Sequence, residues 1–235
     1  MNKSFIKIPK EAIKYIALQR TDYLKNNFFT RLEKYFPKFK KILLKIKCFL
    51  FQNKIRLSYK NDLFTEYEKI KQFLPTKIES ILDIGCGIAG IDILISNHYN
   101  NNIKIFLLDK TEVEKNIHYN FIPIGSFYNS LEKAKKFLIM NRIDKNNIYL
   151  QQATKDNLIM FDEKFDLVIS LLSWGFHYPI KTYLQQVKEK MNARGILIMD
   201  IRKNTEGEEE IKKMFGNIRI ISTSEKIIKI LTYKK

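Results

Sequence analysis

Three glycines and an aspartate near the middle of the chain form the arrangement most able to do chemistry. Gly85, Gly87 and Gly90 follow Asp83 in the segment ILDIGCGIAGIDILIS, with the spacing G-x-G-x-x-G. Glycines at such positions allow a tight turn and let the backbone approach a ligand closely, while a helix that starts there faces the ligand with its N-terminus. On spacing alone, the segment is a fingerprint of nicotinamide or flavin dinucleotide binding.

The residues around the glycines favour a different ligand. Asp83 ends an apolar run, and its carboxylate suits the cationic amino group of a methionine moiety better than a pyrophosphate. The next apolar run, IKIFLLDK, ends in Asp109. A carboxylate at such a strand end accepts hydrogen bonds from both hydroxyls of a ribose, which indicates a ribosyl cofactor without choosing one. A solvated loop aspartate is the simpler alternative.

A hydrophobic strand, an acidic residue and a glycine loop together resemble the first motif of the class I S-adenosylmethionine-dependent methyltransferases. That motif typically reads G-x-G-x-G, and LDIGCGIAG departs from it by placing an alanine before the final Gly90. The resemblance extends from about residue 79 to the C-terminal strands. It implies that Asp83 and the backbone of Gly85, Cys86 and Gly87 hold the amino acid part of S-adenosylmethionine.

The segment QQATKDN, after the third predicted strand, offers polar groups to an adenine ring. By the same resemblance, family members often place an acidic or polar residue here against the adenine amino group. We expect the backbone near Ala153 to lie there, with Gln152 or Thr154 beside it, and an ordinary polar loop is the alternative. Ser170, in the fourth predicted strand, completes the candidate cofactor-binding residues.

The segment FDLVISLLSWGFHYP carries the residues that we assign to the chemical step. It contains the single tryptophan of the chain, Trp174, close to His177 and Tyr178. Methyl transfer from a sulfonium needs an in-line approach, a dry pocket and a nucleophile freed of its proton. His177 is the candidate base because imidazole titrates near neutral pH, and Trp174 and Tyr178 are candidate substrate contacts. A histidine that only donates one hydrogen bond is the alternative.

Two more segments supply candidate residues. The fifth predicted strand ends in Asp200, an alternative base, and Arg202, which either clamps an acidic substrate or pairs with Asp200; we favour the ion pair. Tyr128, in GSFYNSL, is a further candidate substrate contact. GSFYNSL and SLLSWGFHYP resemble segments of methyltransferase-like proteins, some of which are similar to enzymes of surface polysaccharide assembly.

A parallel sheet must position these residues. From residue 81 onward, short apolar runs alternate with helical stretches, which predicts βαβ units. Two final runs, NIRIIST and KIIKILTYK, are separated by a short link and predict an antiparallel hairpin. We therefore expect a Rossmann-like α/β fold, as the class I methyltransferase resemblance also implies, in which ligands bind at the carboxyl ends of the strands.

Residues 1–76 predict a helical extension or lid before a methyltransferase domain over 77–235. Within the extension, KFKKILLKIKCFLF forms an amphipathic helix with most of its lysines turned away from the apolar stripe. Such a helix suits an anionic membrane, RNA or the core of the neighbouring domain, and core packing is the expected use. The stripe consists of Phe39, Ile42, Leu43, Ile46, Phe49 and Leu50.

Composition limits the partners and the compartment. The net charge of +17 suits partners that carry phosphates, but the excess of Lys, Ile and Asn predicts lysines scattered over every face. No run approaches the ~18 apolar residues of a membrane span, and the N-terminus lacks a secretory signal, so we predict a soluble cytoplasmic protein. Cys48 and Cys86 are expected to be reduced, and three histidines are too few to argue a metal site.

The leading hypothesis is an S-adenosylmethionine-dependent methyltransferase acting on a hydroxyl of a small molecule or glycan. An RNA methyltransferase is the first alternative; the positive charge favours it, whereas SLLSWGF stands where nucleic-acid amino methyltransferases use an Asn/Asp-Pro-Pro-aromatic tetrad. The glycine spacing keeps an NAD-dependent oxidoreductase open. A non-catalytic protein that binds the cofactor and acts as a partner is the last alternative.

Overall fold

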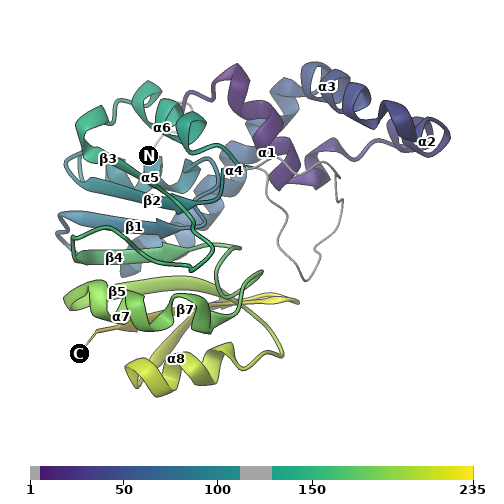
Figure 1. Ribbon diagram of the computed structural model, residues 1–235. Helices are drawn as coiled ribbons and strands as arrows, with labels where there is room; N and C mark the ends of the chain where they lie inside the picture. Colours follow the sequence, from purple (N-terminus) through teal and green to yellow (C-terminus); the bar gives the residue numbers. More distant parts are fainter. Residues whose placement is uncertain (1–5, 112–128, 235) are drawn as a thin grey trace.

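A seven-stranded sheet carries the fold in this computed structural model, which describes residues 6–111 and 129–234 (Figure 1). The strand order is β3-β2-β1-β4-β5-β7-β6, in which β1 to β5 are parallel and β7 is antiparallel to both of its neighbours. The predicted parallel sheet with a C-terminal antiparallel hairpin is confirmed. The strands are β1 (Ser80–Ile84), β2 (Lys104–Asp109), β3 (Ile148–Gln152), β4 (Phe165–Ser170), β5 (Met191–Arg202), β6 (Ile218–Thr223) and β7 (Ile227–Tyr233).

Helices cover both faces of the sheet because the strands are apolar on both sides. Along β1, Ile81 belongs to one buried cluster and Leu82 to the other, as the two-residue period of a strand requires. Helices α5 and α6 pack on the first face, and α7 and α8 pack on the second (Figure 1). Their bounds are α5 (Gly90–His98), α6 (Leu131–Met140), α7 (Leu184–Lys190) and α8 (Gly207–Phe215).

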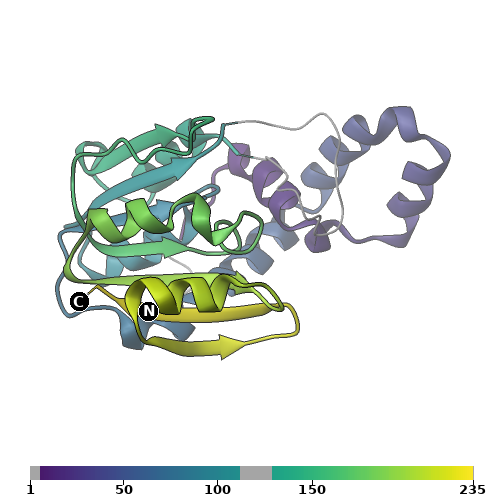
Figure 2. The same ribbon diagram turned by 60° about the horizontal axis from the view of Figure 1, so that its bottom comes forward.

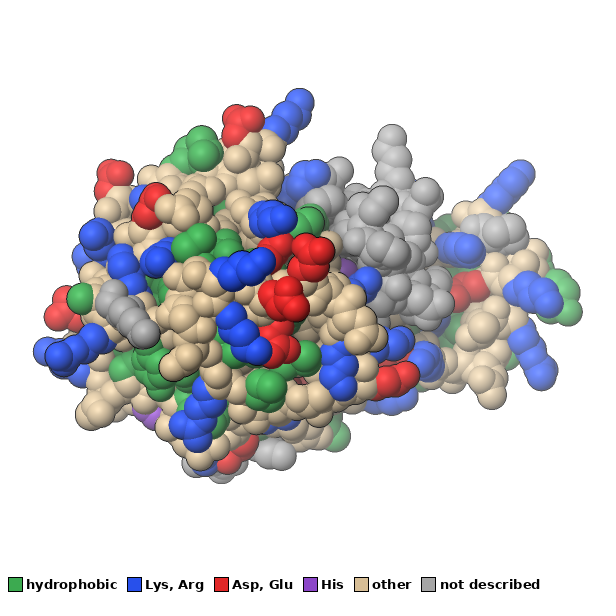
Figure 3. All heavy atoms as spheres, turned by 90° about the horizontal axis from the view of Figure 1, so that it is seen from below, with side chains coloured by type: hydrophobic (Ala, Val, Ile, Leu, Met, Phe, Trp, Pro, Cys, Tyr) green, Lys and Arg blue, Asp and Glu red, His purple; other side chains and the backbone are tan. Residues whose placement is uncertain are grey.

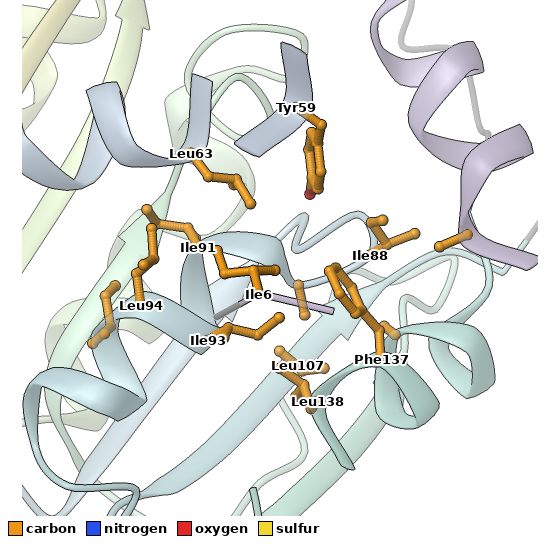
Figure 4. Packing of buried hydrophobic residues seen from close by; sticks show 14 of the residues in the cluster. Ile6, Tyr59, Leu63, Ile88, Ile91, Ile93, Leu94, Leu107, Phe137 and Leu138 are labelled. Atoms are coloured by element: carbon orange, nitrogen blue, oxygen red, sulfur yellow. The ribbon is translucent and has the colours of Figure 1, made fainter. Parts of the chain in front are cut away.

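The N-terminal extension is helical, as expected, and part of it shares the core of the sheet. Buried residues of α1 and α4 lie in the same hydrophobic cluster as β1, α5 and α6, and Figure 4 shows Tyr59 and Leu63 of α4 directed into this cluster. The division into 1–76 and 77–235 stays a prediction. The four helices are α1 (Ile13–Gln19), α2 (Asn27–Tyr35), α3 (Lys40–Leu50) and α4 (Gln52–Ile70), with a short 3-10 turn, Pro37–Phe39, between α2 and α3.

Helices α2 and α3 project away from the sheet (Figures 1 and 2). The prediction that α3 packs its apolar stripe on the core is therefore wrong: Ile42, Ile46 and Phe49 are exposed. The buried residues of α3 are Leu44, Lys47 and Cys48. Periodicity defines an apolar stripe but cannot say which neighbour it meets, and here an ion pair between α3 and α2 sets the orientation of α3.

Gly90 offers a test of how closely the extension packs. It begins α5, and a Cβ atom there would overlap the Tyr59 hydroxyl and lie 3.0 Å from Leu63 Cδ1. We expect Gly90→Ala to lower the free energy of unfolding by about 1–3 kcal/mol, because overpacking outweighs the helix propensity of alanine. Urea unfolding measures it. The same substitution in a Tyr59→Phe background should cost less, and equal costs in both backgrounds would contradict this packing.

Candidate functional site

A cavity of about 1260 Å³ lies at the carboxyl ends of the parallel strands, where sheets of this type bind ligands. Its walls come from the glycine loop after β1, the end of β2, the loop after β4 and the β6–β7 hairpin. The loop after β3 and helices α1 and α4 of the extension also contribute to the lining. The volume exceeds the about 300–1000 Å³ of a typical ligand pocket, so it has room for a nucleoside cofactor and a second molecule.

Two of the three glycines form the turn, and the third has a different role. Gly85 and Gly87 have φ angles of 76° and 57°, in the left-handed region that favours glycine. A Cβ atom on Gly85 would overlap the Ser173 side chain, so the loop after β4 packs directly on this turn. Ala89, not Gly90, continues the left-handed backbone with φ 57°. Gly90 lines the cavity, but the close neighbours of its backbone belong to α4.

Three carboxyl groups lie beside the glycine turn. The Asp109 carboxylate accepts hydrogen bonds from the backbone N–H groups of Gly87 (2.7 Å) and Lys110 (2.6 Å). These bonds fix the side chain that we predict to bind a ribose against the loop. Burial and the neighbouring Asp92 carboxyl raise the pKa of Asp83 well above its usual range. Burial also raises the pKa values of Asp92 and Asp109 to about 6.

Sequence reasoning missed Asp92. It lies in the first turn of α5 and is fully buried. The signal was present, because Asp92 is the single acidic residue in the otherwise apolar run GIDILI, and a carboxyl buried in such a run needs a reason.

Asp83 and Asp109 line the cavity, whereas Asp92 is fully buried beside Asp83 and lies outside the lining. Within residues 6–111 and 129–234, no ion pair joins a lysine or arginine to Asp83, Asp92 or Asp109. A cationic ligand would relieve their mutual repulsion, whereas the pyrophosphate of a dinucleotide would add to it. The site therefore suits a positively charged ligand.

Ser170 and Trp174 support the loop after β4. The Ser170 hydroxyl donates to the backbone carbonyl of Ile84 (2.8 Å), and Ser170 lies outside the cavity lining. Trp174 touches the lining but is fully buried, and its indole N–H donates to the Ile180 carbonyl at 2.8 Å. The polar atoms of both residues are thus engaged within the protein, and their predicted ligand contacts stay predictions.

His177 and Tyr178 line the cavity, as a base and a substrate contact must. The backbone N–H of His177 donates to the Ser173 carbonyl at 2.7 Å, which closes a turn. Ser173, at the start of this turn, lies against Gly85 of the glycine loop. The His177 and Phe176 rings lie 5.0 Å apart edge to face, and the Arg202 guanidinium lies 4.9 Å from the Phe176 ring centroid. Arg202 itself is outside the lining, so it supports the loop from behind.

Asp200 also lines the cavity, but it is held in a buried ion network. Its neighbour across the sheet is Lys229, whose ammonium lies 2.5 Å from Asp200 Oδ1 and 3.0 Å from Glu66 Oε2 of α4. Asp200 Oδ2 accepts from the Leu172 N–H at 3.2 Å, and burial raises the Asp200 pKa against the opposing effect of Lys229. The favoured ion pair with Arg202 is therefore wrong, because strand register brings Lys229 to Asp200 instead.

The remaining predicted residues fall in different places. Ala153 and Thr154 line the cavity, and the Ala153 N–H donates to the Asp109 carbonyl at 2.9 Å. Gln152 is exposed and outside the lining, because alternation along β3 directs it away. Cys86 lines the cavity as a free thiol, and burial raises its pKa. Tyr128 lies outside the described residues.

Comparison with known proteins places the fold. No protein-family model and no curated protein matches the sequence. Among solved structures, a provisionally named O-methyltransferase of Nostoc punctiforme is 15% identical with a TM-score of 0.54, and the match covers 74% of this chain and 56% of that one. A 16S rRNA methyltransferase of T. thermophilus, determined with AdoMet and guanosine, is 12% identical with a TM-score of 0.53; 74% of this chain and 43% of that one are covered.

A precorrin-6y C5,15-methyltransferase of Geobacter metallireducens is 16% identical with a TM-score of 0.50, and the match covers 71% of this chain and 86% of that one. The chain thus spans about half the length of the first two structures. At these identities the likeness concerns the fold, and the chain has the class I methyltransferase fold.

The buried ion network gives a test of how the extension is fastened to the sheet. Lys229→Met should lower the free energy of unfolding by about 3–5 kcal/mol, because Asp200 and Glu66 lose their shared cation inside the protein. Lys226→Met, at an exposed position of the same hairpin, should change it by less than about 0.5 kcal/mol. Chemical denaturation compares them, and equal stabilities of the two variants would refute the network.

Proposed function

We propose that the protein transfers the methyl group of S-adenosylmethionine to a hydroxyl of a small molecule or sugar. The observation that carries the proposal is the group of three carboxyls, Asp83, Asp92 and Asp109, around a glycine turn in a class I methyltransferase fold. S-adenosylmethionine has a sulfonium, an ammonium and a carboxylate group, so its amino acid end has a net positive charge. The three carboxyls disfavour the NAD-dependent oxidoreductase, whose cofactor has an anionic pyrophosphate.

The residues of the cavity fit this cofactor. Asp83 and the backbone from Gly85 to Gly87 would hold the amino acid part. A Cβ atom at Gly85 would overlap Ser173, so this position of the turn has room only for glycine. Asp109 would accept from the ribose hydroxyls, and the backbone of Ala153 would lie against the adenine. When bound, S-adenosylmethionine supplies an electrophilic methyl group.

The chain itself must position the acceptor and remove its proton. His177 would accept the hydroxyl proton at an imidazole nitrogen, because a neutral hydroxyl is a poor nucleophile, and Tyr178 would orient the acceptor. Both carboxylate oxygens of Asp200 already accept from Lys229 or Leu172, which supports His177 over Asp200 as the base. Helices α1 and α4 line the cavity and would limit the access of water.

An RNA acceptor is less well supported by the surface. On the face seen in Figure 3, Lys and Arg side chains are interspersed with Asp and Glu side chains, and they do not form a continuous track. Recognition of a nucleic-acid backbone needs clustered positive charge beside the site. The fold alone does not choose the acceptor, because an rRNA methyltransferase shares it with this chain.

The cofactor assignment predicts selective binding. In calorimetry, the protein should bind S-adenosylmethionine and S-adenosylhomocysteine and not NAD, and Asp83→Ala should weaken S-adenosylhomocysteine binding by roughly tenfold or more. Affinity should fall as the pH is lowered through about 6, where Asp92 and Asp109 become protonated.

The stability of the ligand-free protein should change in the opposite sense. The raised pKa values mean that these carboxyls bind protons more tightly when the chain is folded. Their stabilising contribution is complete below about pH 4 and is lost as the pH rises through about 6.

Tight NAD binding, with no response to S-adenosylhomocysteine, would overturn the cofactor assignment.

The role of His177 predicts a defect in catalysis without a defect in binding. His177→Ala should leave S-adenosylhomocysteine affinity nearly unchanged and lower kcat by about 10²-fold or more. The acceptor for this assay comes from metabolite and glycan profiling with and without the protein, in search of products heavier by one methylene group. If His177→Ala keeps its kcat across neutral pH while Asp200→Asn loses it, the base belongs to β5.

Cofactor binding without turnover of any hydroxylated acceptor would favour the non-catalytic alternative.

A further inference from the structure

One surface of the projecting helices is unusually apolar. Its residues follow one face of α3 at helical spacing, and their exposed fractions lie between 41% and 64%. Isolated exposed apolar residues are ordinary, but a contiguous stripe of large ones marks an interaction surface. We call it the arm face, and it consists of Phe39, Ile42, Ile46, Phe49 and Leu50.

The opposite side of α3 is already occupied by the protein. Leu44, Lys47 and Cys48 are buried there, and the Lys47 ammonium lies 2.9 Å from Glu33 Oε1 of α2. This buried pair fixes which side of α3 faces α2, because either charge alone would be costly away from water. Rotation of α3 to hide the arm face would expose its apolar contacts and break the pair, so the arm face is held outward.

Charge around the arm face is of one sign. Residues 34–61 contain nine lysines and arginines and no aspartate or glutamate. Lys38, Lys40, Lys41 and Lys45 are all exposed beside the stripe. The surface therefore combines large apolar side chains with a rim of positive charge, which is the composition of helices that lie in the interface of an anionic bilayer.

We propose that the arm face binds the surface of an anionic lipid bilayer. A second copy of the chain fits less well, since a twofold contact would bring the same lysines against each other. A nucleic acid would use the lysines but would leave Ile42, Ile46 and Leu50 exposed. No helix among residues 6–111 and 129–234 is long and apolar enough to span a membrane, so the contact is made at the surface.

Binding through the arm face would place the cavity at a set position relative to the bilayer. Helix α4 begins next to the end of α3 and continues to Tyr59, Leu63 and Glu66 in the cavity wall. Its 19 residues form one uninterrupted helix. Because that helix is packed on α5 and tied through Glu66 to Lys229, the arm is joined to the site by a rigid element.

Cosedimentation of the full chain with vesicles tests the proposal. Vesicles of phosphatidylcholine with phosphatidylglycerol should bind the protein, and vesicles of phosphatidylcholine alone should bind it far less. Ile46→Ser/Phe49→Ser should reduce binding by roughly tenfold or more, and Lys41→Gln/Lys45→Gln by roughly fivefold for each lysine. Ile139→Ser/Met140→Ser, at exposed apolar positions of α6, is the matched control and should bind as the parent does.

Three results would overturn the proposal. The first is equal vesicle binding by the parent and by Ile46→Ser/Phe49→Ser. The second is a dimer in analytical ultracentrifugation that this variant dissolves, without vesicle binding by the parent, which would assign the arm face to a second copy. The third is RNA binding at physiological salt that Lys41→Gln/Lys45→Gln abolishes, again without vesicle binding. Circular dichroism of every variant confirms that the helices are retained.

Discussion

The burial of three carboxyl groups beside one glycine turn is the constraint on which the rest of the site depends. Asp83, Asp92 and Asp109 come from β1, α5 and β2, and their charges repel one another where water is scarce. The repulsion and the burial raise the pKa values of all three carboxyls, so the ligand-free protein keeps protons on them to a higher pH than an unfolded chain does. A cationic ligand would let them ionise, so the same arrangement that limits stability at neutral pH would provide free energy for the proposed selective binding.

The extension completes the site and is more than an appended lid. Tyr59 packs on the first turn of α5, and Glu66 reaches Lys229 at the far edge of the cavity. Through these contacts, α4 contributes both to the hydrophobic core and to the cavity wall. The α2–α3 arm uses the same helix as its base, which links the proposed membrane contact to the proposed active site without requiring a flexible joint.

Likeness in fold does not decide the methyl acceptor, and the physical reason lies in how the cavity is built. The proposed cofactor end is made by strand ends and a glycine turn, whose geometry follows from the sheet. The proposed acceptor end is made by α1, α4, the loop after β4 and the β6–β7 hairpin. Such connecting segments and additions vary between proteins of one fold, so methyltransferases with unrelated acceptors share this sheet.

The sequence by itself determined which segments form strands, the C-terminal hairpin and the glycine turn, because these follow from local periodicity and from residues that allow a left-handed backbone. Contacts between distant segments were decided only by the tertiary structure. Strand register brought Lys229, not Arg202, to Asp200. Packing of α5 under the turn placed Asp92 beside Asp83. The orientation of an amphipathic helix depends on the neighbour that it packs against, and the periodicity of its sequence contains no information about that neighbour. Only the fold therefore showed that the apolar stripe of α3 faces outward.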